Sequence, residues 1–343
     1  MRGPLSAPIV ALLAIGCGAS TPPVEEPSEP EPTVIARPLA ALLPGGALSV
    51  VIARPDELAE EPAVRVWSEL VLTDEALERI EIRTGIHPSE LSELVRADYG
   101  EGRVVWLVRG AGDPEALVRA AEMRMNTVAE RGEEPLRRTG FIGTRRRTWA
   151  ALADDSLLVA GGHLEAEVAA ILDAAARARQ PGRSIVGAPE DLDWAVDGLP
   201  QPTTGGYLLA NTMALYQAHR QSPFLLLMPS PLDLPRDTGV GMLLARQDQL
   251  AATIEPEGEL LKLGVTLTGE FPPGAQSNFE QLFVSIAGSD LGHVLGLTDA
   301  RESFSIDVVD ETIQAEVRWP ASGLARGVEL LGTDDPWALI EGG

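Results

Sequence analysis

Cysteine, lysine and histidine are scarce in this chain, and their scarcity excludes several kinds of site. Among 343 residues there is one cysteine, Cys17, one lysine, Lys262, and four histidines. A single cysteine can form neither an intrachain disulfide nor a site with two thiolate ligands. The histidines share no short spacing, so neither a zinc site nor a catalytic dyad is predicted. We therefore expect no metal and no cofactor, and lysine-based chemistry would rest on Lys262 alone.

Positive charge is also in short supply. The chain has 27 Lys and Arg residues against 51 Asp and Glu residues, which gives a formal net charge of -24. Such a charge repels the phosphates of nucleic acid, so no nucleic-acid partner is expected. Hydrophobic residues make up 45% of the chain and charged residues 23%, a composition that can form a substantial core. The length suits two domains or one large one.

The N-terminus carries a short apolar run. Arg2 precedes the segment Ala7 to Ile15, which is too short to cross a hydrocarbon core of ~30 Å but suits the hydrophobic region of a signal peptide. The run ends in Ala14-Ile15-Gly16-Cys17. This ending resembles the lipobox of bacterial lipoproteins, although Ala14 stands where that family usually has leucine. The alternative is an ordinary secretory peptide with an incidental cysteine.

The resemblance implies a location at a membrane. In lipoproteins, residues corresponding to 1–16 are removed as signal peptide and the cysteine corresponding to Cys17 is acylated. Two or three acyl chains, at ~0.8 kcal/mol per buried CH₂, would anchor the protein stably. Gly18 follows the cysteine, which in the family's sorting rule points to the outer membrane, facing the periplasm. Residues 17–38 are rich in proline and glutamate and are predicted to form an extended spacer of ~3.1 Å per residue.

The body of the chain contains the same order of elements twice. The order is strand, helix, two strands and helix. The first copy has strands 103–109, 144–152 and 156–160, with helices 113–129 and from 163 onward. The second copy has strands 260–268, 303–309 and 312–319, with helices 276–287 and 321–331. This pattern predicts an α+β fold of two similar halves, 39–185 and 186–343. Antiparallel sheets covered by helices are expected, of the split βαβ or ferredoxin-like type. Whether the halves are a true duplication stays open.

Further elements are predicted outside the repeat. They are a strand at 47–54, helices at 56–70, from 73 and at 90–97, strands at 239–246 and 249–254, and a boundary between the halves at 181–202. Asp113 is expected to cap the helix that follows it, with Pro114 in the first helical position.

Arginines are concentrated between residues 119 and 147, a local reversal of sign in an acidic chain. If residues 144–152 form a strand, Arg145, Arg147 and Trp149 share one face. With Arg138 they form a candidate contact patch for an anionic partner, such as a headgroup, a peptidoglycan carboxylate or an acidic protein. The alternative is a solvated sheet face whose arginines pair with the protein's own carboxylates.

Five large apolar residues stand between Pro223 and Pro229. Phe224, Leu225 and Leu226 begin this run, which is too short to span a bilayer. On a loop it could touch a membrane or cover an apolar ligand. The favoured alternative is packing between the two halves.

These observations lead to a functional hypothesis without a recognised activity. The pattern from Leu43-Pro44-Gly45 to Pro55 resembles bacterial envelope proteins, which implies no chemistry. We expect a membrane-anchored envelope lipoprotein with a non-catalytic binding or scaffolding role, whose partner is an envelope protein or a lipid. A carrier of an apolar ligand and a hydrolase with dispersed catalytic residues remain alternatives, and the oligomeric state is not predicted.

Overall fold

The computed structural model describes the following residues: 38–65, 78, 81–82, 86–152, 155–178, 215–228, 247–271, 273–289, 292–293, 296–309 and 311–323. Residues 37–343 form one compact unit. The signal segment 1–16, Cys17, the spacer up to residue 37 and the predicted boundary at 181–202 lie outside the described residues.

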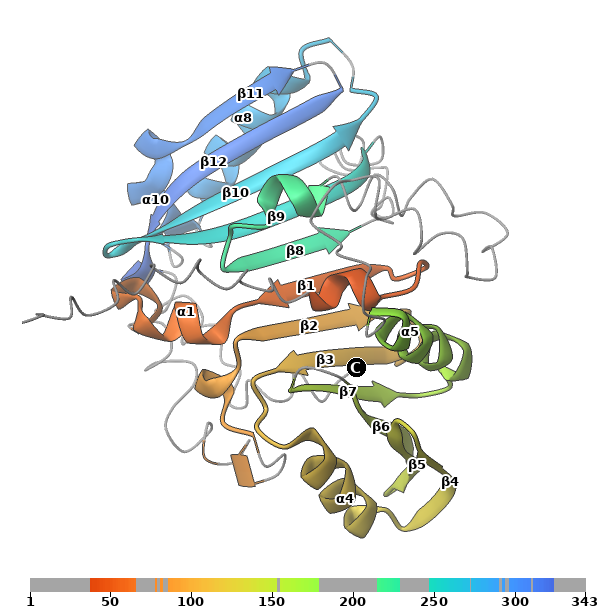
Figure 1. Cartoon of the computed structure of the whole chain (residues 1–343). Helices are drawn as coiled ribbons and strands as arrows, with labels where there is room; N and C mark the ends of the chain where they lie inside the picture. Colours follow the sequence, from red (N-terminus) through yellow and green to blue (C-terminus); the bar gives the residue numbers. More distant parts are fainter. Residues whose placement is uncertain are drawn as a thin grey trace, which may run out of the picture. The chain divides into compact units, whose positions relative to one another are not determined.

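The described strands form a single antiparallel sheet of twelve strands, in the order β11-β12-β10-β9-β8-β1-β2-β3-β7-β6-β5-β4 (Figure 1). The strands are β1 Ser49–Ala53, β2 Glu93–Asp98, β3 Val104–Arg109, β4 Thr127–Glu133, β5 Leu136–Ile142, β6 Arg145–Ala151, β7 Ser156–Gly161, β8 Phe224–Met228, β9 Gln247–Glu257, β10 Leu260–Gly269, β11 Ser305–Val309 and β12 Thr312–Pro320. The helices are η1 Leu39–Leu42, α1 Pro55–Glu60, η2 Pro88–Glu90, α4 Pro114–Arg124, α5 Glu165–Ala178, α8 Ala275–Ala287, α10 Leu297–Ala300 and η4 Arg301–Ser303. The predicted combination of antiparallel strands and covering helices is confirmed.

Strands β1 and β8 join two sections of this sheet. We call β1 to β7 the N-terminal section and β8 to β12 the C-terminal section. Their junction is antiparallel, with Val50 opposite Leu227 and Ala53 opposite Phe224. Outward from it, the order is β1-β2-β3-β7-β6 in one section and β8-β9-β10-β12-β11 in the other, and the N-terminal section continues into β5 and β4. In each section a helix, α4 or α8, follows the third strand along the chain.

Helices cover the sheet on both of its faces. Side chains alternate along a strand, so Val105 and Leu107 of β3 point to one face and Val108 to the other. The first face packs against η1 and α5, including Ile171, in the largest core cluster, which continues into β8 and Ala251. The second face packs against α4 in the N-terminal section and α8 in the C-terminal section. Among the described residues, no helix has the length and hydropathy of a membrane-spanning helix.

The prediction of a helix at residues 90–97 is wrong. Residues Glu93–Asp98 form strand β2, which pairs with β1 and β3. The apolar residues Leu91, Leu94 and Val95 happen to have helical spacing, but the observed burial alternates along the strand. Two neighbouring strands supply hydrogen bonds and burial for this segment, and this tertiary context outweighs its local helix preference.

The helix predicted at 113–129 begins as expected and ends early. The Asp113 side chain accepts hydrogen bonds from the backbone N–H groups of Glu115 and Ala116, and Pro114 occupies the first turn. The helix ends at Arg124, and the following residues form strands β4 and β5, which the sequence analysis missed. Strand β4 is exposed and rich in charge, so its pattern lacks the apolar alternation that identifies a strand.

The remaining predicted elements have mixed outcomes. The predicted strand 47–54 is confirmed as the shorter β1, and strands 260–268 and 312–319 are confirmed as β10 and β12. The predicted helix 56–70 is interrupted at Glu61, where α1 has ended and a further helical turn begins. The predicted strand 239–246 lies outside the described residues, as does most of the helix predicted at 321–331.

Candidate functional site

The predicted patch residues lie on strands β5 and β6, next to helix α4. In the register of these strands, Arg138 lies opposite Trp149, Gly140 opposite Arg147 and Ile142 opposite Arg145. Directly opposed residues point to the same face, so the four patch residues do share a face. Helix α4 covers part of this face, because Trp149 and Leu136 belong to the core cluster that contains Val118 of α4.

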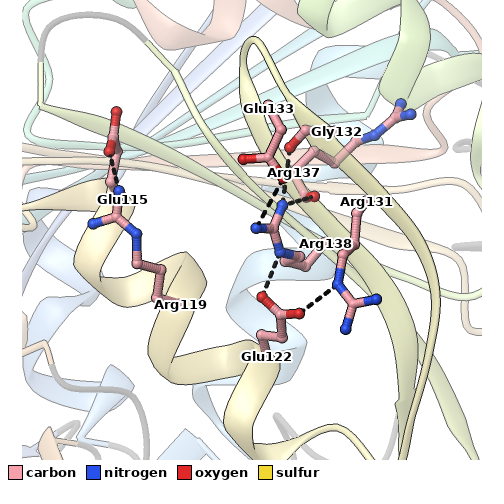
Figure 2. A network of polar contacts seen from close by, with 8 residues as sticks. All are labelled: Glu115, Arg119, Glu122, Arg131, Gly132, Glu133, Arg137 and Arg138. Atoms are coloured by element: carbon pink, nitrogen blue, oxygen red, sulfur yellow. Dashed lines mark hydrogen bonds and ion pairs between the residues drawn. The ribbon is translucent and has the colours of Figure 1, made fainter.

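Arg138 is buried and occupied by protein acceptors. Its residue surface is 7% exposed. Its guanidinium donates to Glu122 at 2.5 Å and to the carbonyl oxygens of Gly132 and Arg137, each at 2.9 Å, and its Nη2 lies 3.2 Å from Glu133. Figure 2 shows this guanidinium enclosed by those groups. The guanidinium of Arg138 is therefore used within the protein, and its role as a contact for an external anion stays a prediction.

Glu122 of α4 connects the helix to two strands. One carboxylate oxygen accepts from Arg138 of β5 and the other from Arg131 of β4, at 2.7 Å (Figure 2). These two guanidinium groups hold the pKa of Glu122 below its usual value. The carboxylate thereby fastens α4 to the β4–β5 hairpin.

Trp149 is also largely buried. Its residue surface is 8% exposed, and the guanidinium of Arg124 lies 5.6 Å from the ring centroid, within the range of a cation–π contact. Its role in the predicted patch for an anionic partner stays a prediction, made on a ring that is largely buried. Helix α4 covers this position, which the spacing of residues along β6 could not indicate.

Most other arginines of the cluster pair with carboxylates. The pairs are Arg119 with Glu115 at 2.6 Å, Arg137 with Glu130 at 3.8 Å, and Arg146 with Glu130 at 3.8 Å and Glu165 at 2.9 Å. The local reversal of sign is thus largely neutralised within the protein. Of the predicted patch, the side chain of Arg145 is exposed but has a partner of its own, and Arg147 is partly exposed.

The predicted apolar contact segment is strand β8. Leu225 is 1% exposed and lies in the largest core cluster, whereas Phe224 and Leu226 point to the opposite face and are partly buried. Leu226 lies opposite Val51 of β1 and Ala252 of β9. Strand β8 lies between β1 and β9, and one of its faces packs in the largest core cluster. Such an interior strand is expected to be apolar.

A second polar cluster lies where β2, β3 and helix 215–219 meet, and the sequence analysis missed it. Glu93 accepts hydrogen bonds from the backbone N–H of Leu39 at 2.8 Å and from Arg109 at 2.6 Å. Burial raises the pKa of Glu93, although Arg109 and the Leu39 N–H act in the opposite direction. Burial and the nearby Glu93 raise the pKa of Tyr216 to about 12.

This cluster holds the start of the folded region against the sheet. Glu93 is 9% exposed, and its bond to Leu39 fixes η1 at the edge of the largest core. Arg54, at the end of β1, donates to the carbonyl oxygens of Arg220 and Gln221 after the helix at 215–219. The alternation of buried and partly buried positions along β2 could have indicated that Glu93 faces the core. The sequence analysis interpreted the segment as a helix and so did not place Glu93 there.

Comparisons with known proteins give no family. No family model matches the chain, and no curated protein matches it in sequence. Among solved structures, crystal form III of TP0453 has a TM-score of 0.47 and 12% sequence identity over 86% of this chain and 99% of that chain. Crystal form I of TP0453 has a TM-score of 0.44 and 12% identity over 87% and 99% of the two chains. These similarities are too weak to indicate an activity or a partner.

Proposed function

We propose that the protein is an acylated envelope lipoprotein whose folded part has a non-catalytic binding or scaffolding role. The proposed anchor is Cys17 at the end of the lipobox-like segment, after removal of residues 1–16. The acidic, proline-rich residues 17–38 would hold the folded part away from the bilayer. Gly18 supports placement in the outer membrane, facing the periplasm.

The binding or scaffolding proposal is supported by the structural contacts that buried and paired carboxyl groups make. Glu122 and Glu93, the two carboxyl groups described above with shifted pKa values, fasten α4 and η1 to the sheet. Groups used in this way support the framework of a large sheet, which suits a protein that presents surfaces to partners. Leu225 and Leu227 are used in the core, so strand β8 gives the alternative of an apolar ligand carrier no support.

We further propose that the two sections descend from one repeated unit of the split βαβ type. The support is the matching order of neighbours, β1-β2-β3-β7-β6 and β8-β9-β10-β12-β11. In the N-terminal section, β7 lies between β3 and β6 and is antiparallel to both, so β3 and β6 are parallel to one another. In the C-terminal section, β12 lies between β10 and β11 in the same way. Helix α4 lies between β3 and β6 along the chain, followed there by β4 and β5, and α8 lies between β10 and β11.

The anchor is tested on protein purified from its native envelope. Intact mass measurement is expected to give a chain that begins at Cys17 and carries acyl groups, and Cys17→Ser is expected to abolish that modification. Crosslinking followed by recovery of the anchored protein is expected to give a reproducible envelope partner. Retention of residues 1–16 with an unmodified thiol would falsify the anchor, and consistent failure to recover any partner would count against scaffolding.

A further inference from the structure

Arg147 differs from the other arginines of the cluster in what surrounds it. Its cross-strand neighbours are both glycines, Gly140 of β5 and Gly161 of β7. A Cβ atom at Gly161 would lie 2.7 Å from Nη1 of Arg147, so the guanidinium rests directly over the β7 backbone. The absence of a side chain at residue 161 leaves room for it there.

This guanidinium lacks the carboxylates that neutralise its neighbours. Its hydrogen bond to the described part of the protein runs from Nη1 to the carbonyl oxygen of Arg146, at 3.1 Å. Within the described ranges, no carboxylate lies at ion-pair distance from it, whereas Arg119 and Arg131 each have one and Arg138 has two. Burial, followed by the nearby charge of Arg145, lowers the pKa of Arg147, although a guanidinium stays protonated at neutral pH.

A partly buried cation without a counter-charge is costly, and a bound anion would remove that cost. Arg145 lies two residues along the same strand and points to the same face, about 6.6 Å away by strand geometry. A guanidinium presents several N–H donors in a planar fork that matches the oxygens of an oxyanion.

We propose that Arg147, together with Arg145, binds a phosphate group. A phosphate monoester carries a charge of roughly -1.5 to -2 at neutral pH, which suits Arg147, a guanidinium with no carboxylate at ion-pair distance among the described residues, with the charge of Arg145 close by. The same group occurs on small soluble molecules and on lipid headgroups, so the proposal names the phosphate itself and the experiment below distinguishes its source. This inference names a ligand class that the proposed binding role leaves open, and it does not depend on the lipid anchor.

Calorimetric titration of the full chain in detergent with inorganic phosphate, at constant ionic strength, tests the site. We expect saturable binding that weakens at least tenfold in Arg147→Gln and by a smaller factor in Arg145→Gln. Arg119→Gln is the matched control, because Arg119 is exposed on α4 and paired with Glu115, and its affinity is expected to stay within twofold of wild type. Arg147→Lys keeps the charge but loses the fork, so an intermediate affinity is expected.

Thermal unfolding separates loss of the site from loss of the fold. Without phosphate, Arg147→Gln is expected to melt at or above the wild-type temperature, since it removes a cation without a paired carboxylate. With phosphate, the melting temperature is expected to rise in wild type and in Arg119→Gln but not in Arg147→Gln. An Arg147→Gln protein that melts normally and still binds phosphate with wild-type affinity would overturn the proposal.

Two further arms identify the source of the anion. Sodium acetate at the same ionic strength is expected not to compete, and equal competition would overturn the phosphate assignment in favour of a general counter-ion effect. Phosphatidylcholine vesicles with and without phosphatidic acid test a lipid phosphate. Binding to phosphatidic acid vesicles that is lost in Arg147→Gln supports a lipid source, and binding of inorganic phosphate alone supports a soluble source. Absence of binding in every arm would overturn the site.

Discussion

The two sections of the sheet share an order of strands but differ in how their faces are used. In the N-terminal section, α5 covers one face and α4 the other, and strand β7 is buried at nearly every position. In the C-terminal section, α8 covers one face, and Lys262, Thr266 and Glu316 lie on the opposite face. A shared topology therefore does not set the pattern of burial.

The composition of individual strands sets that pattern. Strand β7 reads Ser-Leu-Leu-Val-Ala-Gly, a continuous apolar run of the kind that is buried on both faces. Strand β12 reads Thr-Ile-Gln-Ala-Glu-Val-Arg-Trp-Pro and alternates, so Ile313 and Val317 are buried while Gln314, Glu316 and Arg318 are not. The outer edges differ too, because β4 carries Glu130, Arg131 and Glu133 whereas Val309 of β11 is 60% exposed.

The largest effect is expected from breaking the junction between the sections. Leu226→Pro would remove a backbone donor from a strand that has neighbours on both sides. We expect a loss of about 3 kcal/mol or more in the free energy of unfolding. Urea unfolding followed by circular dichroism is the measurement. The same change in the edge strand β11, Val308→Pro, is expected to cost less, and equal costs would show that β8 does not join the sections.

Substitutions that leave a cavity allow the cores of the two sections to be compared directly. Ile171→Ala in α5 leaves a void in the largest core and is expected to cost about 3–5 kcal/mol. Ile313→Ala in β12 lies in a smaller core with more partly buried neighbours, which can relax, so about 2–3 kcal/mol is expected. Both values come from chemical unfolding at one temperature. A larger loss for Ile313→Ala would contradict the ranking of the cores.

The polar attachment of α4 is expected to contribute less than the cores. Arg138→Met removes hydrogen bonds from a buried guanidinium to Glu122 and to two carbonyl groups, with an expected loss of about 1–3 kcal/mol. Arg119→Met on the exposed face of the same helix is the control, and a change within about 0.5 kcal/mol is expected there. Similar losses for both variants would mean that Arg138 does not hold the hairpin to α4.

The smallest expected effect is on how the free energy of unfolding depends on pH, where Glu122 and Glu93 act in opposite directions. The pKa of Glu122 is lowered in the fold, so its stabilisation is present above its usual value of 4.5 and is lost as pH falls through the lowered pKa. The pKa of Glu93 is raised, so its contribution is present below 4.5 and is lost as pH rises through the raised pKa.

Unfolding free energies measured across pH 3 to 7 for wild type, Glu122→Gln and Glu93→Gln test these signs. Relative to wild type, Glu122→Gln is expected to flatten the loss on the acid side of the curve. Glu93→Gln is expected to flatten the loss as pH rises above about 4.5. A difference curve of the same sign for both variants would show that one of the two pKa directions is incorrect.

The sequence predicted the elements whose signals are local. Asp113 followed by Pro114 identified the start of α4, and apolar runs bounded by turns identified β1, β3 and β10. It failed for β2, whose apolar residues also fit a helical spacing, and for β4, whose residues are mostly exposed. Both strands exist because neighbouring strands pair with them, and the partner of a strand is far away in the chain.

The candidate patch divides in the same way. Strand alternation correctly placed Arg145, Arg147 and Trp149 on one face. It could not indicate that α4 would bury Trp149, that Glu122 would bind Arg138, or that glycines would flank Arg147. Each of these depends on an element packed onto the strand, which the alternation along the strand does not encode.

By itself, the sequence determined the charge, the expected anchor, and the positions of strong caps and apolar runs, because these depend on residues adjacent in the chain. Only the tertiary structure decided which arginines of the cluster pair with carboxylates, and that Arg147 has no carboxylate of the described residues at ion-pair distance. Ion pairing depends on distances of a few ångströms between side chains, and those distances are set by how helices and strands from distant parts of the chain pack together.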